Sequence, residues 1–443
     1  MTGKVLIRGG CVLTLGRRTP NYTEADVLVD GDRIAEVGER LRARGAEVID
    51  ATDTIVMPGF VDSHRHAWKS LFRNLGVPGQ NGANIVASAD FGRHYQPEDV
   101  YAATLIGLLG ALEAGITTVV DWADIQFDDT YTEAALEAHA DSGLRTVLAR
   151  AVPSWAEGHF DVGLGLRRLM EAQAGSPVTI AYGSDDPTRD DLDVIAEEWA
   201  LARELSFRIH THVGSKNADK GVVSSLAERG LLGDDVTLVH CSHLEDREFD
   251  AISSSGASVV STPSSEMATG QGSPSIQQLI DRNIRPGLGV DDERVSPGDI
   301  FAQMRATISF QHATHFDLKL AGKGGLPSLL KTRDVIRYAT TDGSRATGLG
   351  DVTGSLEPGK QADIIVLRAD SPNIAPVNDP IGAIVWGMDT SNLDWVFVGG
   401  KALLRHGVLD ADVDRARSLA ADAQTRVTAA SGFLVEPGSV EST

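Results

Sequence analysis

Residues 58–66 read PGFVDSHRH, an apolar run that ends in two histidines separated by one residue. Side chains at positions i and i+2 of a β-strand point to the same side of the strand. His64 and His66 would therefore present two imidazoles to one point in space. Neutral imidazoles are typical ligands of Zn²⁺ and related divalent metals. The run predicts a strand that enters a barrel and carries metal ligands at its end.

Three further signals follow in chain order, and each ends a short apolar run rich in β-branched residues. They are His210 with His212, then His240 with His243, and finally Asp291 after GLGV. A single pair among 12 histidines could arise by chance. The ordered set, with every member at a predicted strand end, favours one metal site assembled from separate strands.

The middle of the chain, from about residue 58 to about residue 350, alternates between strand and helix patterns. The predicted strands cover 58–64, 116–121, 145–150, 178–183, 207–212, 236–241, 257–262 and 285–291. Eight strands joined by helical crossovers predict a (β/α)8 TIM-like barrel of the α/β class. The metal candidates then lie at the C-terminal ends of strands one, five, six and eight, where such barrels carry their active sites. An open, doubly wound sheet is the alternative, but it would keep strands one and eight apart.

Short strands also occur near both ends of the chain. The Asp30-Gly31 pair predicts a hairpin in the first set, and a second set follows residue 362. We expect the two sets to pair. The predicted domains are a small composite β-sandwich domain from 1–57 and 358–405, the metal-dependent barrel from 58–357, and a C-terminal helical tail from 406–443.

The composition is typical of a globular protein, with 42% hydrophobic and 23% charged residues. The formal net charge of −22 argues against a nucleic acid or an anionic membrane surface as the main partner. The two cysteines, Cys11 and Cys241, make no disulfide framework, which favours a reducing cytoplasm. No apolar run is long enough to predict a membrane span. We expect a cytoplasmic protein with a small-molecule substrate.

These motifs resemble the amidohydrolase superfamily, in the branch of cytosine, guanine, 8-oxoguanine and S-adenosylhomocysteine deaminases and triazine hydrolases. The segment GSLEPGKQADI at 354–364 is similar to the family's return into its β domain. The resemblance implies that one divalent metal ion is bound by the following ligands: His64, His66, His212 and Asp291. It also implies that His240 contacts the attacking water.

The resemblance bears on the number of ions as well. Members with two metals place a lysine on strand four to bridge the ions, and residues 178–183 contain none. We therefore expect a single ion, Zn²⁺, with Fe²⁺ or Mn²⁺ as alternatives. The relatives also imply a homo-oligomer, a dimer or larger.

One departure from the family concerns the proton shuttle. The deaminases carry a glutamate three residues after the strand-five histidine, and Ser215 occupies that position here. A serine hydroxyl has far too high a pKa to replace a carboxylate as a base. Glu266, after strand seven, is a candidate replacement, although it could equally be a loop residue with a salt-bridge partner. The predicted catalytic residues are His240, Asp291 and Glu266.

Five residues are candidates for substrate contact: Trp68, Arg73, Arg150, Ser215 and His243. Each position near a strand end also has a structural interpretation. Core packing is the alternative for Trp68, a structural ion pair for Arg150, and loop packing for His243. An arginine at the barrel rim could instead bind a substrate carboxylate.

The sequence thus predicts a mononuclear metal-dependent amidohydrolase that acts on C–N bonds of a small aromatic or N-heterocyclic substrate, as a deaminase or hydrolase. Because Ser215 replaces the glutamate, the alternative is an amidohydrolase-like cyclase or condensing enzyme of natural-product biosynthesis, for example one that forms a benzoxazole ring. A metal-holding barrel without catalytic activity is the third interpretation.

Overall fold

The computed structural model describes residues 3–75, 88–155, 165, 178–188, 191–215 and 220–432. Its centre is a sheet of eight parallel strands in sequential order. The strands are β6 (Phe60–Arg65), β7 (Ile116–Ala123), β8 (Arg145–Arg150), β9 (Thr179–Ser184), β10 (Arg208–Val213), β11 (Val236–His240), β12 (Ser258–Ser261) and β13 (Gly287–Leu288). The predicted (β/α)8 barrel is confirmed, and each predicted strand has its counterpart.

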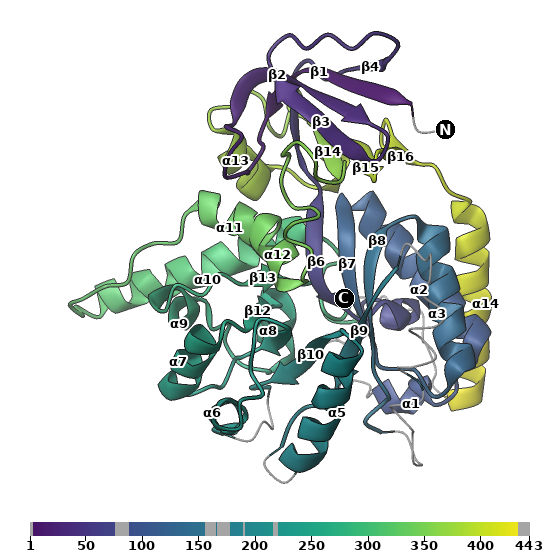
Figure 1. Ribbon diagram of the computed structural model, residues 1–443, viewed down its shortest axis with the longest axis vertical. Coiled ribbons are helices and arrows are strands. Elements are labelled where there is room, and N and C mark those ends of the chain that lie inside the picture. Colours follow the sequence, from purple (N-terminus) through teal and green to yellow (C-terminus); the bar gives the residue numbers. More distant parts are fainter. Residues whose placement is uncertain are drawn as a thin grey trace, which may run out of the picture.

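Helices surround this barrel and connect its strands (Figure 1). They are α1 (Ser88–Gly92), α2 (Pro97–Glu113), α3 (Asp129–Ser142), α5 (Leu192–Glu204), α6 (Val222–Glu228), α7 (Asp246–Ser255), α8 (Pro263–Thr269), α9 (Ile276–Asp281), α10 (Ile300–Leu320), α11 (Thr332–Tyr338) and α12 (Thr341–Ala346). A 3₁₀ helix, η1 (Ala67–Phe72), follows β6 directly. Start signals are visible at several helices. Asp128, for example, caps α3 by accepting a hydrogen bond from the Thr130 amide.

Backbone hydrogen bonds between the first strand and the segment after the last strand close the barrel. The Asp291 amide donates to the His64 carbonyl, and the His66 amide donates to the Asp291 carbonyl, each at 2.9 Å. Strand eight is shorter than predicted, because β13 ends at Leu288 and the chain continues as a single bridge between Arg65 and Asp291. This bridge holds strands one and eight together, which the open-sheet alternative would have forbidden.

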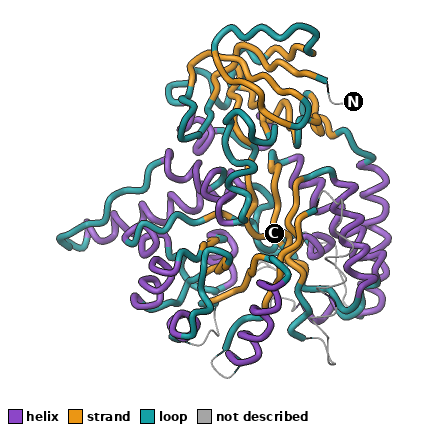
Figure 2. The backbone as a smooth tube through the Cα atoms, viewed as in Figure 1, coloured by secondary structure: helices purple, strands orange, loops and turns teal. Residues whose placement is uncertain are grey.

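The two ends of the chain form one separate mixed sheet, as predicted (Figures 1 and 2). Its strands are β1 (Lys4–Val12), β2 (Tyr22–Asp30), β3 (Arg33–Gly38), β4 (Glu47–Asp50), β5 (Thr54–Pro58), β14 (Ile364–Arg368), β15 (Leu393–Val398), β16 (Lys401–Arg405) and β17 (Val408–Leu409). Strand β5 joins the halves, since it pairs with β1 on one side and antiparallel with β14 on the other. Arg145 of β8 ties the barrel to this sheet through hydrogen bonds of 2.7 and 3.0 Å to the Asp363 carboxylate.

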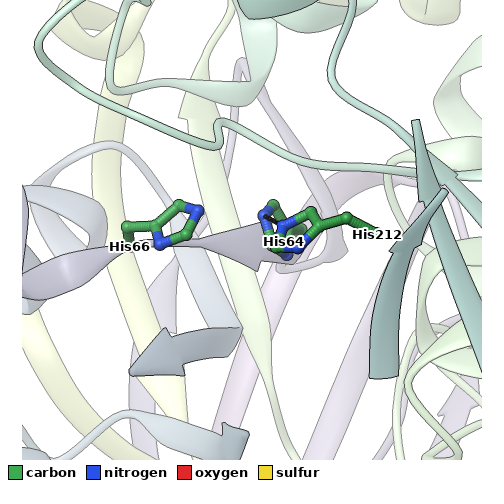
Figure 3. Close-up of side chains that lie close together, drawn as sticks. All are labelled: His64, His66 and His212. Atoms are coloured by element: carbon green, nitrogen blue, oxygen red, sulfur yellow. Dashed lines mark hydrogen bonds between the residues drawn. The ribbon is translucent and has the colours of Figure 1, made fainter. Parts of the chain in front are cut away.

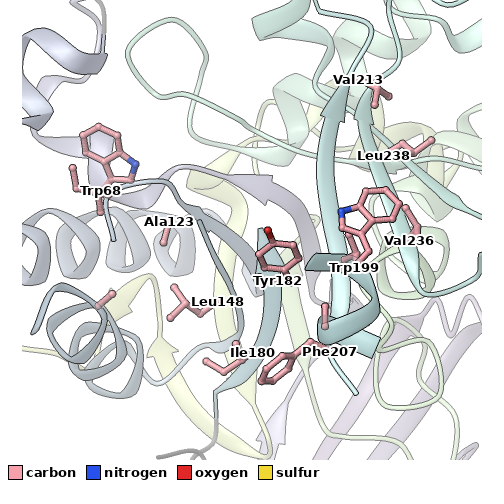
Figure 4. Close-up of a cluster of buried hydrophobic side chains, with 14 of the residues drawn as sticks. Trp68, Ala123, Leu148, Ile180, Tyr182, Trp199, Phe207, Val213, Val236 and Leu238 are labelled. Carbon is pink, nitrogen blue, oxygen red and sulfur yellow. The ribbon is translucent and has the colours of Figure 1, made fainter. Parts of the chain in front are cut away.

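The last helix, α14 (Val413–Ser431), lies along the outside of the barrel beside α2 (Figure 1). Its Ala423 and Val427 are buried in the same apolar cluster as Val100 and Ala103 of α2. Figure 4 shows part of this cluster, which fills the space between the strands and the surrounding helices. The proposed division of the chain at 57/58, 357/358 and 405/406 stays a prediction. None of the described helices is long and apolar enough to cross a membrane.

The close approach at the closing segment requires a glycine. A Cβ atom on Gly289 would lie 2.7 Å from the His64 carbonyl oxygen and 3.0 Å from the His64 backbone nitrogen. No real Cβ contact is this short against backbone, so a side chain here would push the two strands apart. Gly324 provides a contrast, because a Cβ there would meet nothing within 4 Å.

We therefore expect Gly289→Ala to lower the free energy of unfolding by about 1–3 kcal/mol, the usual range for overpacking. It should also reduce the amount of metal that the purified protein retains, because the clash lies on the backbone of His64. Gly324→Ala should change neither quantity by a comparable amount. Denaturant unfolding and elemental analysis of both variants make this comparison. Equal unfolding free energies and metal contents in the two variants would show that the closing segment at Gly289 tolerates a side chain.

Candidate active site

Three histidine rings converge at the C-terminal end of the barrel. His64 and His66 project from β6 and its end, and His212 reaches toward them from β10 on the opposite side (Figure 3). One ring nitrogen from each of the three lies within 4.8 Å of the others. The Nε2 atoms of His64 and His212 are 3.2 Å apart. The rings of His64 and His66, at positions i and i+2, thus face one point, as strand geometry requires.

Asp291 adds a carboxylate to this cluster. Its Oδ1 atom lies 3.3 Å from Nε2 of His66 and 3.6 Å from Nε2 of His64. Its Oδ2 atom accepts a hydrogen bond of 2.5 Å from the Ser265 hydroxyl. The backbone of Asp291 has a φ of 66°, a left-handed conformation that is uncommon outside glycine and is often found where function dictates geometry.

Two outer carboxylates orient the histidines from behind. Nδ1 of His66 lies 2.8 Å from Oδ1 of Asp124, which also accepts a hydrogen bond of 2.6 Å from the Trp68 indole. Nδ1 of His212 lies 3.3 Å from Oδ1 of Asp186. A carboxylate on the far ring nitrogen fixes the tautomer that leaves Nε2 free as a ligand, which is the usual arrangement behind metal-binding histidines.

The charges of the cluster fit a cation. Burial, with the neighbouring His212 and His66 rings, lowers the pKa of His64 well below its usual value, so this imidazole is neutral. Burial lowers the pKa of His66 as well, but Asp124 and Asp291 outweigh burial and raise it to about 9. These carboxylates thus favour a positive charge at His66, which a bound cation would supply in place of the proton. Three converging imidazoles and one carboxylate are the donor set that tetrahedral or five-coordinate Zn²⁺ accepts. The residues present therefore fit one divalent ion.

His240 lies beside the cluster at the end of β11. Its ring is stacked on that of His212 with centroids 5.3 Å apart, and its Nδ1 atom lies 3.1 Å from the Thr262 hydroxyl and 3.5 Å from Glu266. Burial lowers the pKa of His240, but the contact with Glu266 and the nearby Asp291 outweigh burial, so the net shift is upward. The φ of His240 is 72°, again in the left-handed region.

Glu266 is fully buried and is not among the residues that line the pocket described below. Its Oε1 atom accepts a hydrogen bond of 2.8 Å from the Thr262 amide, and its Oε2 atom accepts one of 3.0 Å from the Ser261 hydroxyl. This arrangement orients His240 through Nδ1. The catalytic role predicted for Glu266 stays a prediction.

A pocket of about 510 Å³ opens in front of the histidines. Of the predicted residues, those that line it are His66, His212, Ser215, His240 and Asp291. It is strongly polar, and its further charged residues are Lys69, Asp124, Asp185, Asp186, Asp191, Asp292 and Arg294. Trp122 of β7 supplies an aromatic wall, with its ring centroid 4.3 Å from that of His212. Ser215 therefore does face the space in which a substrate would bind.

Trp68 and Arg73 lie elsewhere. The Trp68 side chain is buried in the apolar cluster of Figure 4, where it packs against Phe91 and Tyr95. Arg73 donates hydrogen bonds of 3.0 and 3.1 Å to the Glu293 carboxylate. Neither residue lines the pocket, so the structure places Trp68 in packing and Arg73 in an ion pair.

The remaining candidates are also outside the pocket lining. Arg150 is buried at the end of β8. His243 is exposed, and its ring lies beside the backbone of Gly272. His210 lies on the same side of β10 as His212 but is not part of the three-histidine cluster of described residues. Burial lowers the pKa of His210 to about 3, with the charges of Arg208 and His212 acting in the same direction.

Sequence reasoning missed the outer carboxylates Asp124 and Asp186 and the pocket residues Lys69 and Asp292. Asp124 follows β7, and Asp186 follows β9, so both stand where barrel strands carry functional side chains. That position was the available signal for them. Lys69 lies three residues after His66 and Asp292 directly follows Asp291, but nothing local distinguishes them from surface residues.

The comparisons with known proteins agree with this geometry. The sequence profile of the amidohydrolase family matches residues 55–403. The 5'-deoxyadenosine deaminase of Methanosarcina mazei is 28% identical over 424 residues, which cover 90% of this chain and 93% of that protein. The 5-methylthioadenosine/S-adenosylhomocysteine deaminase of Pelotomaculum thermopropionicum is 28% identical over 442 residues, covering 95% of this chain and 98% of that protein.

Solved structures share the fold at lower sequence identity. A zinc-bound adenosine deaminase from Xanthomonas campestris superposes with a TM-score of 0.82 at 20% identity, over 96% of this chain and 99% of that chain. Atrazine chlorohydrolase from Arthrobacter aurescens TC1 in complex with zinc gives a TM-score of 0.79 at 23% identity, over 95% of this chain and 100% of that chain. At these identities the likeness concerns the fold alone.

The outer carboxylate of His66 provides a test of the site. Because Asp124 fixes the tautomer of His66, Asp124→Asn should weaken metal binding by about 10- to 100-fold, the range found for such supporting partners. Competition with a chelator measures this affinity directly. The control is Asp234→Asn, an exposed carboxylate at the other end of the barrel, which should bind metal as the wild type does. Unchanged affinity in Asp124→Asn would contradict the supporting role.

Proposed function

Because this chain belongs to the amidohydrolase family, we propose that it is a hydrolase that binds one Zn²⁺ ion and acts on a carbon–nitrogen bond of a small aromatic or N-heterocyclic substrate. One observation carries this proposal. Three histidines, of which His64 and His66 are buried, converge with a carboxylate on one point at the C-terminal end of a (β/α)8 barrel and face a polar pocket. This is the end of such barrels at which chemistry takes place.

The residues that would hold the ion are His64, His66, His212 and Asp291. When bound, a divalent ion of this kind lowers the pKa of water to about 7 and acts as a Lewis acid toward the substrate. A single ion is proposed because β9, which reads TIAYGS, offers no lysine to bridge a second.

Proton movement would rest on His240 and Asp291. Thr262 and Glu266 hold His240 through Nδ1, so its Nε2 atom is the one directed to the pocket and able to donate or accept a proton. The Ser265 hydroxyl fixes Oδ2 of Asp291 and leaves Oδ1 facing the histidines. Together these groups would orient the attacking water and accept its proton.

The substrate class is supported by the relatives. Those quoted above are named for the deamination of adenine nucleosides or for the hydrolysis of atrazine. Each such substrate contains a planar nitrogen ring, and a pocket of about 510 Å³ lined by Trp122 accommodates a ring of that size.

A second function is favoured by one observation. Ser215 lines the pocket at the position where the resembling deaminases carry a glutamate, so the ordinary proton shuttle of a ring deaminase is absent there. An enzyme without this shuttle could use a hydroxyl of its own substrate as the nucleophile and eliminate water. The alternative proposal is therefore a cyclising or condensing enzyme, such as one that forms a benzoxazole ring.

Incubation with a panel of aromatic amines, aromatic amides, purines and triazines tests both proposals. Mass spectrometry distinguishes hydrolysis, which adds water and releases ammonia or an amine, from cyclisation, which removes water. We expect turnover that a chelator abolishes and added Zn²⁺ restores. Turnover that survives complete metal removal would contradict both versions of the proposal.

Two variants separate the proposed base from the serine. His240→Ala should lower kcat/KM on the identified substrate by about 10²- to 10⁴-fold, as expected for loss of a general base. Ser215→Ala should cost no more than about tenfold, the effect of one lost hydrogen bond. Both variants should retain metal, because neither residue is among the proposed ligands.

Ser215→Glu is the complementary change. It restores the family's carboxylate, and we expect it to create or raise ring-deaminase activity on the amine panel. If Ser215→Ala were as inactive as His240→Ala, the serine itself would take part in the chemistry, and the assignment of proton transfer to His240 and Asp291 would be wrong.

A further inference from the structure

Lys69 is a buried cation that lines the pocket. It lies on η1, three residues beyond His66, and only 8% of its side chain is exposed. Its ammonium lies over the Trp68 ring, 5.6 Å from the ring centroid. Lysine is among the residues least often buried without a partner, because removing an ammonium from water is costly.

The neighbours of Lys69 do not satisfy this ammonium. Its Nζ atom lies 3.7 Å from Oδ2 of Asp292 and 4.0 Å from Oδ2 of Asp124. Both distances exceed that of a hydrogen bond. Among the described residues, none has an acceptor within hydrogen-bond distance of Nζ. The ammonium therefore has unused hydrogen-bond donors at a position that lines the pocket.

The two nearby carboxylates already have other partners. Asp124 accepts hydrogen bonds from His66 and the Trp68 indole, and both go to its Oδ1 atom. Asp292 accepts hydrogen bonds from Arg294 on both of its oxygens, at 3.0 and 2.9 Å from Nε. Neither carboxylate lies within hydrogen-bond distance of the Lys69 ammonium. The Lys69 ammonium thus remains open to an acceptor that enters the pocket.

From this geometry we infer that the substrate carries a carboxylate, which the Lys69 ammonium binds at the strand-one side of the pocket. The inference rests on the proposed function, since it names a feature of that substrate. A charged acceptor forms stronger hydrogen bonds with an ammonium than a neutral carbonyl does, and it also compensates the buried charge. Lys69 is accordingly a specificity-determining residue that selects acidic ring compounds over neutral ones of the same shape.

A matched pair of probes tests this without any turnover. 2-Aminobenzoate and 2-aminobenzamide have nearly the same size and shape but differ in charge. Calorimetry on the zinc-loaded enzyme should show that the carboxylate binds about 10- to 100-fold more tightly than the amide, as expected for hydrogen bonds to a charged group. In Lys69→Met this preference should disappear, while the affinity for the amide stays unchanged.

Three further proteins make the result specific. Lys69→Arg keeps the charge and should retain most of the preference. Lys401→Met, which removes an exposed lysine on β16, should behave as the wild type does. Zinc content is measured for every variant, and Lys69→Gln replaces Lys69→Met if the latter loses zinc or fails to fold.

Several outcomes would overturn the inference. They are equal affinity for the two probes in the wild type, no binding of either probe, a carboxylate preference that survives in Lys69→Met, and loss of zinc in both neutral variants. The surviving preference would place the carboxylate on the metal ion, and the loss of zinc would assign Lys69 to support of the metal site. Absence of metal-dependent turnover on the wider panel would instead contradict the hydrolase proposal, so the two failures are distinguishable.

Discussion

The site depends on the pair of backbone hydrogen bonds between Asp291 and the segment from His64 to His66. These bonds close the barrel. They also bring the Asp291 carboxylate, which follows the barrel's eighth strand β13, against His64 and His66 at the end of its first strand β6. Gly289 makes the approach possible because its backbone lies against that of His64. Closure of the fold and assembly of the donor set are therefore the same event, and a change in one should appear in the other.

Local periodicity was sufficient for most of the fold. The alternation of strands and helices predicted the barrel, and the i, i+2 spacing of His64 and His66 predicted that both rings share one side. The pairing of the two ends followed from the strand sets near each of them, although β5, the strand that pairs with β14, was not among the predicted strands. Contacts between distant residues could not be predicted in this way. The pairs of Arg73 with Glu293 and of His66 with Asp124 depend on tertiary packing, which no local pattern encodes.

The pocket has Ser215 at the position where the resembling deaminases carry a glutamate. Glu266 is buried beside His240 and Ser215 lines the pocket, so the proposed function relies on Asp291 and His240 to accept the proton. Lys69, which also lines the pocket, carries an ammonium that donates no hydrogen bond to any described side chain. A rigid proton acceptor and an unsatisfied cation together favour a substrate that is fixed by its own acidic group.

Anomalous diffraction at the zinc absorption edge, from crystals of the zinc-loaded protein, tests the central claim most directly. The account predicts one peak per chain, about 2.0–2.2 Å from the Nε2 atoms of His64, His66 and His212 and from a carboxylate oxygen of Asp291. Two peaks bridged by an oxygen, or a single peak away from these four residues, would contradict it.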